Sequence, residues 1–302
     1  MSGQRRPTSF YYLAAFFATF IIFLYGPMLI IVMLSFQGPQ GGLTFPMNGM
    51  STFWFEQLWE GVGVIDIWRG FRRSLQLGLV VMTLTVILSL AAGLAFRQRF
   101  FGASTVFFVV VSSLIMPSIV VSLGIGLGFQ LLDDSVMWIG ENYEIGYILE
   151  EFETTTGLFT SALGAHLTWT LPFGLLIMFA VFNRFNQAHE EAARDLGANQ
   201  WQTIRYVVIP IIAPSLIGVA LFGFTLSYDE LARTQQAAGS KNTLPLDLQG
   251  LTTTVTTPEI YALGTVTLAV SFAIIFTTVA IVMHLQRRRS AHGSDAGKGM
   301  VL

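Results

Sequence analysis

Two neighbouring acids, Asp229 and Glu230, are the side chains of this sequence best placed to bind a charged ligand, because they directly follow a long apolar stretch. Carboxylates at the end of a membrane-buried segment can attract a cation and raise its local concentration. Arg233 follows three residues later, so the alternative is a pair of ordinary interfacial charges with Arg233 as their salt-bridge partner. Asp229 and Glu230 are therefore candidate cation-binding residues, with that structural alternative left open.

Groups suited to catalysis or to metal binding do not gather in this sequence. Cysteine is absent, and the histidines stand singly at His166, His189, His284 and His292. There is no His-Glu-x-x-His zinc motif and no Gly-x-Ser-x-Gly nucleophile motif. A phosphate-binding loop needs Gly-x-x-x-x-Gly-Lys-Ser/Thr, whose spacing the fragment at 293–299 does not meet. We predict that the chain is no enzyme, has no catalytic, cofactor or metal site, and uses His166 as a hydrogen-bonded structural residue.

A polar stretch at residues 187–204, here called the polar elbow, separates two long apolar segments. Its first half favours helix, with acids early, and Gly197 falls where a left-handed helix cap is expected. Residues 198–204 can then resume a helix. Ala192 and Ala193 form a small, flat surface that another protein can approach closely. The polar elbow is therefore a candidate for transmitting a conformational change from a soluble partner protein to the apolar segment that follows it.

The composition indicates an integral membrane protein. Of the 302 residues 53% are hydrophobic and only 11% are charged, whereas a soluble domain carries roughly a quarter charged residues. A membrane-spanning helix needs about 20 apolar residues, and the first such stretch is too long for the apolar core of a signal peptide. Six stretches qualify: about 10–36, 74–96, 103–132, 158–183, 205–228 and 260–285. The sequence thus predicts an all-α protein with six transmembrane helices.

The basic residues predict that both termini are cytoplasmic, because Lys and Arg are enriched in cytoplasmic loops. Of the 16 basic residues, 11 fall on the side of the termini: Arg5, Arg6, Arg97, Arg99, Arg184, Arg194, Arg205, Arg287, Arg288, Arg289 and Lys298. The opposite side receives Arg69, Arg72, Arg73, Arg233 and Lys241. Most of the acids lie on that opposite side, including Glu144 and six others in the loop at 133–153, which holds no basic residue. This acidic loop is a solvated face or a docking surface for another protein, and it favours a cationic ligand.

Several residues interrupt the predicted spans. Pro27, Pro117 and Pro172 lie inside apolar runs, where each removes one backbone hydrogen bond and kinks the helix. Gly124 and Gly128 form a Gly-x-x-x-Gly pair in the third span, which permits close approach of another helix. We interpret this pair as a packing feature, with a hinge as the alternative.

The polar elbow resembles the "EAA" signature of ABC-importer permease subunits. The match consists of Glu191-Ala192-Ala193, three residues, Gly197, nine residues, Val207, one residue, and Ile209-Pro210. Every fixed spacing of the signature is met, with conservative replacements at two aliphatic positions. The pattern also stands in the expected place, between the fourth and fifth of six spans.

Further segments resemble one branch of that family, the second permease subunit of polyamine (spermidine/putrescine)-type importers. They are Leu221–Glu230 at the end of span five, Leu244–Leu246 and Thr257–Leu263 before span six, and His166–Pro172 in span four. The likeness covers roughly residues 50–285. It departs at Arg233, which introduces a positive charge near the acids.

The resemblance implies a type I ABC importer permease fold, with residues 1–302 as a single permease domain, coupling helices at about 187–204 and a flexible tail at 286–302. It implies that Glu191, Ala192, Ala193 and Gly197 couple the chain to ATP-hydrolysing subunits. The expected partners are two ATP-binding subunits carrying ATP and Mg, a second permease subunit in a heterodimer, an extracytoplasmic solute-binding protein and membrane lipid, but no nucleic acid. The expected location is the bacterial inner membrane, and the expected solute is a polyamine or other small organic cation. An ion-gradient-driven secondary transporter or channel subunit is the alternative function.

Overall fold

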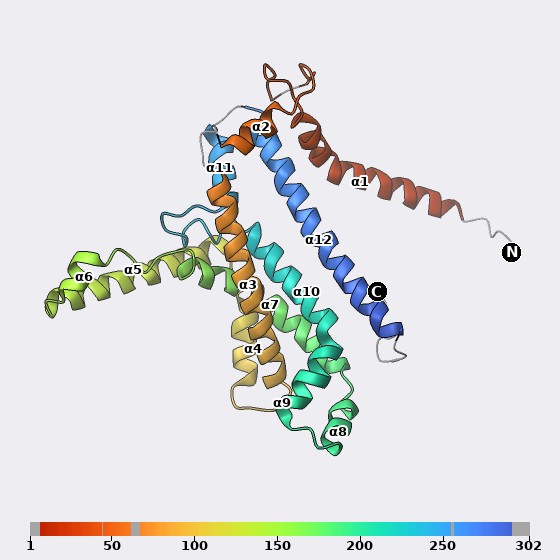
Figure 1. The fold of residues 1–302 in the computed structure, drawn as a ribbon, viewed down its shortest axis with the longest axis vertical. Helices are drawn as coiled ribbons and strands as arrows, with labels where there is room; N and C mark the ends of the chain where they lie inside the picture. Colours follow the sequence, from red (N-terminus) through yellow and green to blue (C-terminus); the bar gives the residue numbers. More distant parts are fainter. Residues whose placement is uncertain (1–6, 44, 62–66, 255–256, 292–302) are drawn as a thin grey trace. The chain divides into compact units, whose positions relative to one another are not determined.

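The computed structural model describes residues 7–43, 45–61, 67–254 and 257–291, and most of these residues are helical. The elements are α1 Thr8–Leu34, α2 Phe53–Glu60, α3 Ile67–Ala95, α4 Ala103–Ser112, α5 Ser118–Asn142, α6 Gly146–Glu151, α7 Ser161–Arg184, α8 Ala188–Asp195, α9 Gln200–Thr203, the π-helical turn η1 Ile204–Val208, α10 Ile209–Tyr228, α11 Leu244–Thr254 and α12 Glu259–Ala291 (Figure 1). Within these residues there is no strand, and Gln37 and Met50 form one isolated bridge. The all-α prediction is confirmed. Arg5, Arg6, His292, Lys298 and the predicted tail from residue 292 onward lie outside the described residues.

Within the described residues, six helical segments are long and apolar enough to cross a membrane, in agreement with the predicted number. They are α1, α3, α5, α7, the continuous stretch Gln200–Tyr228, and the part Glu259–Thr277 of α12. Five of them overlap the predicted spans closely. The third span was predicted wrongly in its extent.

The predicted third span, 103–132, is broken into α4 and α5. The prediction that Pro117 lies inside a helix is wrong. Pro117 is the N-cap residue of α5, with φ −56° and ψ 130°. A proline disfavours helical backbone at the residue before it, so α4 ends upstream. Pro27 and Pro172, by contrast, lie inside α1 and α7 as predicted. Because α4 has only 10 residues, it is too short to cross a bilayer.

The break moves the apolar crossing towards the C-terminus of the segment. Helix α5 continues to Asn142, so Asp133 and Asp134, placed in a loop by the sequence analysis, lie on this helix. Among the described residues of this chain no helix packs closely on Gly124 or Gly128, since a Cβ at either position would meet no atom within 4 Å. Gly126 faces inward instead, where a Cβ would lie 2.8 Å from the carbonyl oxygen of Gln236.

The chain divides into two compact units, and the first contains the residues up to Ile67 together with Leu248–Phe272. In this unit the buried Gln37 organises the loop after α1. Its side chain donates to the carbonyl of Gly42 over 3.0 Å and accepts from the N–H of Asn48 over 2.9 Å. Tyr261, in the first turns of α12, donates its hydroxyl to the carbonyl of Leu43 over 3.2 Å. These bonds fix the loop within its unit.

The second unit, Trp68–Asp247 with the chain from Ala273 onward, is a helix bundle built on α3, α7 and α10. Small residues let these helices approach closely. A Cβ on Gly174 of α7 would lie 2.9 Å from the Cβ of Ser89 on α3. A Cβ on Gly223 of α10 would lie 3.2 Å from the Cα of Met82 on α3. The buried hydroxyls of Thr85 and Thr170 satisfy each other over 2.7 Å across the α3–α7 contact.

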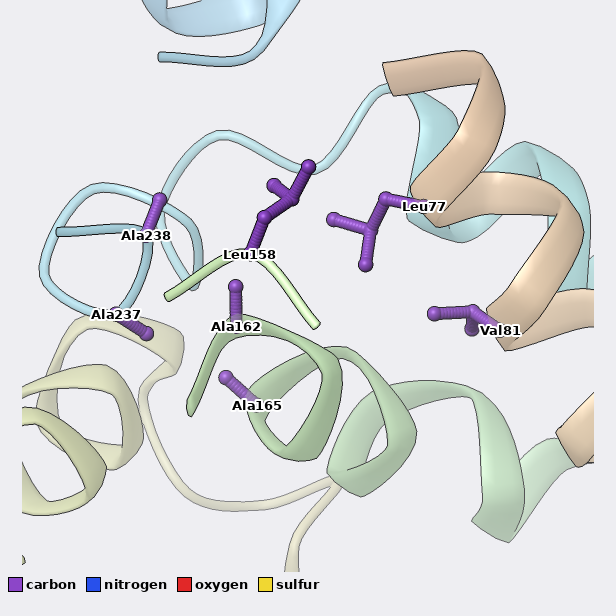
Figure 2. Close-up of a cluster of buried hydrophobic side chains, with 7 residues drawn as sticks. All are labelled: Leu77, Val81, Leu158, Ala162, Ala165, Ala237 and Ala238. Carbon is purple, nitrogen blue, oxygen red and sulfur yellow. The ribbon is translucent and has the colours of Figure 1, made fainter. Parts of the chain in front are cut away.

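Among the described residues, two clusters of buried apolar side chains lie in this bundle. One lies towards the start of α7 and consists of Leu77, Val81, Leu158, Ala162, Ala165, Ala237 and Ala238 (Figure 2). Figure 2 shows that Ala237 and Ala238 come from the loop after α10, which folds over the first turns of α7. The other cluster, Met178, Val208, Ile212 and Val219, joins the second half of α7 to η1 and α10. The second cluster therefore anchors the start of α10 in the bundle.

The close helix contact at Gly174 predicts a stability difference between two glycines of α7. We expect Gly174→Val to lower the free energy of unfolding by about 1–3 kcal/mol, because a side chain there overlaps α3. Gly164→Val is the matched control, since a Cβ at Gly164 meets no atom within 4 Å. The thermal unfolding midpoints of the two purified complexes in detergent measure the difference. Equal midpoints would contradict the close α3–α7 contact.

Candidate functional site

The polar elbow consists of two short helices joined by a defined turn. Helix α8 ends in a left-handed cap at Gly197, whose φ is +85°, as predicted. The N–H of Gly197 donates to the carbonyl of Arg194 over 2.8 Å, and the N–H of Ala198 donates to that of Ala193 over 3.0 Å. This pair of bonds is the Schellman motif, which satisfies carbonyls at the end of a helix. The angle at which α8 leaves the turn is therefore set by Gly197.

Helix α9 starts with a capping box immediately after this turn. The N–H of Gln202 donates to Oδ1 of Asn199 over 2.9 Å, and the N–H of Asn199 donates to Oε1 of Gln202 over 2.8 Å. From Gln200 the chain stays helical through η1 and α10 to Tyr228. Pro210 lies at the start of α10, just after the π-helical turn. The polar elbow is thus continuous with a membrane-spanning helix. This helix begins at Gln200, earlier than the start near Val207 that the sequence suggested.

The predicted coupling residues lie together on the surface of the polar elbow. Glu191, Ala192 and Gly197 are exposed, and Ala193 is half-buried. Two large apolar residues that the sequence analysis missed lie beside them. Leu196 is 89% exposed and Trp201 is 64% exposed. The exposure of Leu196 could have been predicted from the sequence, because Leu196 is an apolar residue directly before the capping glycine of a polar stretch. The polar elbow therefore exposes an aromatic and an aliphatic side chain near the predicted coupling residues, and exposed aromatic residues are typical of protein interfaces.

An ion pair that the sequence analysis did not find fixes α8 to the end of α3. Nη1 of Arg97 lies 2.6 Å from Oε1 of Glu190, and the side chains of the two residues are 19% and 9% exposed. The guanidinium of Arg97 also lies over the rings of Phe182 and Phe185, with its carbon 5.2 and 5.6 Å from the ring centroids. The second oxygen of Glu190 faces Arg194 at 3.5 Å. Figure 1 shows α8 at the end of the bundle where the chain turns from α3 towards α4.

The two candidate cation-binding acids lie at the other end of α10. Asp229 is the exposed C-cap residue of α10, and partial burial of its carboxyl raises its pKa. Glu230 is half-buried and accepts the backbone N–H of Arg233 over 3.0 Å. These two acids are adjacent in the structure, but they are not joined to the polar elbow, since α10 separates them from it.

The guanidinium of Arg233 does not form the expected salt bridge with these acids in the part of the chain that the structure describes. It is fully buried and donates to Oγ of Ser118 and the carbonyl of Ser113, each over 3.3 Å, and to Oγ1 of Thr168. Its carbon lies 4.9 Å from the ring centroid of Trp169. Arg233 therefore ties the loop after α10 to α7 and to the break between α4 and α5.

His166 is a structural residue, as predicted. Its Nδ1 lies 2.8 Å from Oγ of Ser227, and its Nε2 lies 2.8 Å from Oγ1 of Thr234. Both ring nitrogens are thus engaged, and the side chain is buried. Among the described residues no group of three or more His, Cys, Asp or Glu side chains could hold a metal ion.

The sequence is similar to those of membrane components of transport systems. A family profile for the "Binding-protein-dependent transport system inner membrane component" matches residues 85–291. The chain is 28% identical over 280 residues to the spermidine/putrescine transport system permease protein PotC of Haemophilus influenzae, covering 92% of this chain and 97% of that protein. It is 26% identical over 280 residues to the putrescine transport system permease protein PotI of Escherichia coli K12, covering 92% of both.

Solved structures show a related fold. A chain of a bacterial ABC transporter involved in the import of the acidic polysaccharide alginate superposes with a TM-score of 0.67, covering 94% of this chain and 96% of that chain, at 16% identity. A chain of the MetNI methionine ABC transporter superposes with a TM-score of 0.53, covering 78% of this chain and 99% of that chain, also at 16% identity.

Proposed function

This chain belongs to the family of binding-protein-dependent transport system inner membrane components, and from that premise we propose that it helps to form the pathway by which an ABC importer takes up a small organic cation. The chain is a multi-pass permease subunit with the type I importer fold and is not an enzyme. ATP is used by separate subunits of such importers. Family membership favours this function over an ion-gradient-driven transporter or channel.

The coupling mechanism depends on the helical continuity between the polar elbow and α10. Glu191, Ala192, Ala193 and Gly197 dock on one of two ATP-binding subunits, which carry ATP and Mg. The exposure of Glu191, Ala192 and Gly197 supports this assignment, as does the uninterrupted helix from Gln200 to Tyr228. A partner that binds the polar elbow differently in two states can shift the bundle between those states. Alternating access would follow from this shift.

The proposal also covers the partner subunits of this chain and its orientation in the membrane. Residues 1–302 act as one permease domain beside a second, different permease chain, and an extracytoplasmic binding protein delivers the solute. Both termini lie in the cytoplasm, with the polar elbow on the same side. The predominance of basic residues on that side supports this orientation. The ion pair between Arg97 and Glu190 supports it further, because it places two loops assigned to the cytoplasm at the same end of the bundle.

The solute proposed is a polyamine or another small organic cation. Relatives named for spermidine and putrescine transport support this choice. So do the acids after α10, since Asp229 is exposed and the guanidinium of Arg233 is engaged by hydroxyl and carbonyl groups. Asp229 therefore presents its carboxylate where a cation would enter or leave the pathway, whereas Glu230 also interacts electrostatically with Arg233.

Reconstituted uptake tests the whole proposal. We expect proteoliposomes containing both permease chains and the ATP-binding subunits to accumulate a radiolabelled amine only with hydrolysable ATP and the binding protein present. A panel of putrescine, spermidine, amino acids and neutral sugars identifies the solute class. Uptake driven by an ion gradient without ATP would reject the importer function, and uptake of neutral solutes only would reject the cation.

Neutralising the two acids after α10 gives a direct test of their role. We expect the double variant Asp229→Asn/Glu230→Gln to lower the initial rate of amine uptake about thirtyfold at limiting solute, because each of the two charges contributes about 1 kcal/mol to attracting a cation in water and 1.4 kcal/mol is tenfold. The Gln side chain keeps an acceptor for the N–H of Arg233. The matched control is Glu150→Gln/Glu151→Gln on α6, where both acids are exposed, as Asp229 is. Equal initial rates of amine uptake in the double variant and in the control would show that Asp229 and Glu230 do not attract the solute.

A further inference from the structure

Arg97 joins three helices at the end of the bundle that carries the polar elbow. The residue follows the last residue of α3, Ala95, by two positions. Its guanidinium contacts Glu190 in the first turn of α8 and covers the rings of Phe182 and Phe185 at the end of α7. Arg97 and Glu190 are 93 residues apart in the sequence. The contact therefore links α8 to a span that the chain itself does not connect to it directly.

The geometry favours a rigid contact rather than a loose surface pair. A charge-assisted hydrogen bond of 2.6 Å between side chains that are 19% and 9% exposed is screened little by water. The planar guanidinium can bond a carboxylate at its edge while its face rests on aromatic rings, which an ammonium group cannot do in the same way. The phenylalanine rings thus hold the orientation of Arg97 while Glu190 binds it.

An open pocket lies between the end of α3 and the polar elbow beside this ion pair. It has a volume of about 250 Å³ and is lined by Leu94 and Gln98 on the α3 side and by Gln187, Glu191, Gln200 and Thr203 on the elbow side. A pocket has no packed apolar atoms that could transmit a displacement. Arg194, the second cation at Glu190, lies on α8 itself at 3.5 Å and 59% side-chain exposure, so it links α8 to no other helix.

We propose that Arg97 is a positioning residue that transmits the movement of α8 to α3, with Glu190 as its anchor on the coupling helix. This inference rests on the proposed function, in which α8 docks on an ATP-binding subunit. The chain itself joins α8 to α7 through residues 185–187, and it joins the polar elbow to α10 by a continuous helix. The ion pair adds a direct connection from α8 to α3, which neither of these links provides. Losing the ion pair leaves docking intact but lets α8 move without carrying α3 with it.

The first test compares Arg97→Gln and Glu190→Gln in the full complex with its ATP-binding subunits and binding protein. We expect each variant to keep the ATP-binding subunits bound and to hydrolyse ATP, while solute taken up per ATP hydrolysed falls at least tenfold. In the double variant, solute uptake per ATP hydrolysed should fall no further than in either single variant, because each single substitution already removes the same contact. Arg97→Lys should fall between wild type and Arg97→Gln. Arg99→Gln, at an exposed arginine of the same loop between α3 and α4, is the matched control and should leave the ratio unchanged.

Covalent rescue keeps the proposal testable even if the glutamine variants assemble poorly. The chain contains no cysteine, so Arg97→Cys/Glu190→Cys can be linked specifically by bifunctional methanethiosulfonate reagents of increasing length. A reagent that spans the original contact should restore uptake per ATP, and its reduction should abolish uptake again. The single cysteine variants treated with the same reagents should show no recovery.

Three results would overturn the inference. They are an unchanged ratio of uptake to ATP hydrolysis in Arg97→Gln, a verified cross-link that restores nothing, and loss of bound ATP-binding subunits in proportion to lost uptake. The last result would make Arg97 a support for the docking surface only and would leave the proposed function standing. The proposed function itself would fail if the wild-type polar elbow bound no ATP-hydrolysing subunit, and wild-type co-purification measures that separately.

Discussion

Replacing Gly197 by valine is expected to abolish ATP-dependent uptake almost completely. Gly197 has φ +85° and closes the Schellman motif at the end of α8. A β-branched residue is a conformational outlier in this region, and the left-handed backbone costs roughly 1–2 kcal/mol even for less restricted residues. The turn relieves this strain by changing conformation, and α8 then leaves the bundle at another angle. Because each 1.4 kcal/mol of lost docking energy is about tenfold in affinity, we expect the binding of the ATP-binding subunits to fall at least tenfold.

Gly61 supplies the matched control for this substitution. It also ends a helix, α2, with a left-handed backbone at φ +68°, and a Cβ there would meet no atom within 4 Å, as at Gly197. Gly61→Val therefore introduces the same kind of backbone strain away from the polar elbow. Co-purification of the ATP-binding subunits and uptake into proteoliposomes should be lost in Gly197→Val and largely kept in Gly61→Val. If both variants kept uptake, the polar elbow would not be the coupling element.

Removing the buried charge at Arg233 should have the second large effect. Arg233→Met deletes hydrogen bonds to Ser113, Ser118 and Thr168 together with the contact over Trp169. It also leaves half-buried acceptors without that donor, and hydrogen bonds to charged groups contribute roughly 1.5–3 kcal/mol each. We expect a loss of about 3 kcal/mol in the free energy of unfolding after partial relaxation. The thermal midpoint of the purified complex should fall clearly, and uptake should fall with it.

Two comparisons separate the role of Arg233 from a general effect of charge. Arg233→Lys keeps the charge, but an ammonium cannot reach all three acceptors in the fixed geometry of a guanidinium, so most of the loss should remain. Lys241→Met removes an exposed positive charge from the same loop and should leave the midpoint unchanged. A midpoint of Arg233→Met equal to that of wild type would show that the break between α4 and α5 does not depend on this side chain.

The local features of the polar elbow could be predicted because neighbouring residues determine them. Gly197 tolerates a left-handed backbone, and the residues before and after it favour helix, so the break between α8 and α9 follows from short-range preferences. The start of the following span was placed too late. Asn199 and Gln202 form a capping box that begins a helix at Gln200, and this helix continues without a break into α10. The apolar pattern shows where a membrane helix is buried, but it does not show where its polar extension begins.

The third span shows a different limit of sequence reasoning. Residues 103–132 form one apolar run, and hydropathy does not record that Pro117 divides it. Prolines inside α1 and α7 are tolerated without such a break, so the residue type does not determine the outcome. At the break, the carbonyl of Ser113 accepts from Arg233 and the hydroxyl of Ser113 donates to the carbonyl of Thr168 over 2.6 Å. Partners from distant segments stabilise the interrupted helix there.

The sequence by itself determined that the chain is a six-span, all-α membrane protein with a glycine-capped polar elbow before its fifth span, because hydropathy, helix length and backbone preference act over short distances. Only the tertiary structure decided which distant side chains meet. Arg97 and Arg233 are both arginines near apolar segments, and nothing in their neighbours shows that one binds Glu190 while the other is buried against Trp169. Such pairings depend on how the helices approach one another, and close packing at glycines such as Gly174 and Gly223 sets that approach.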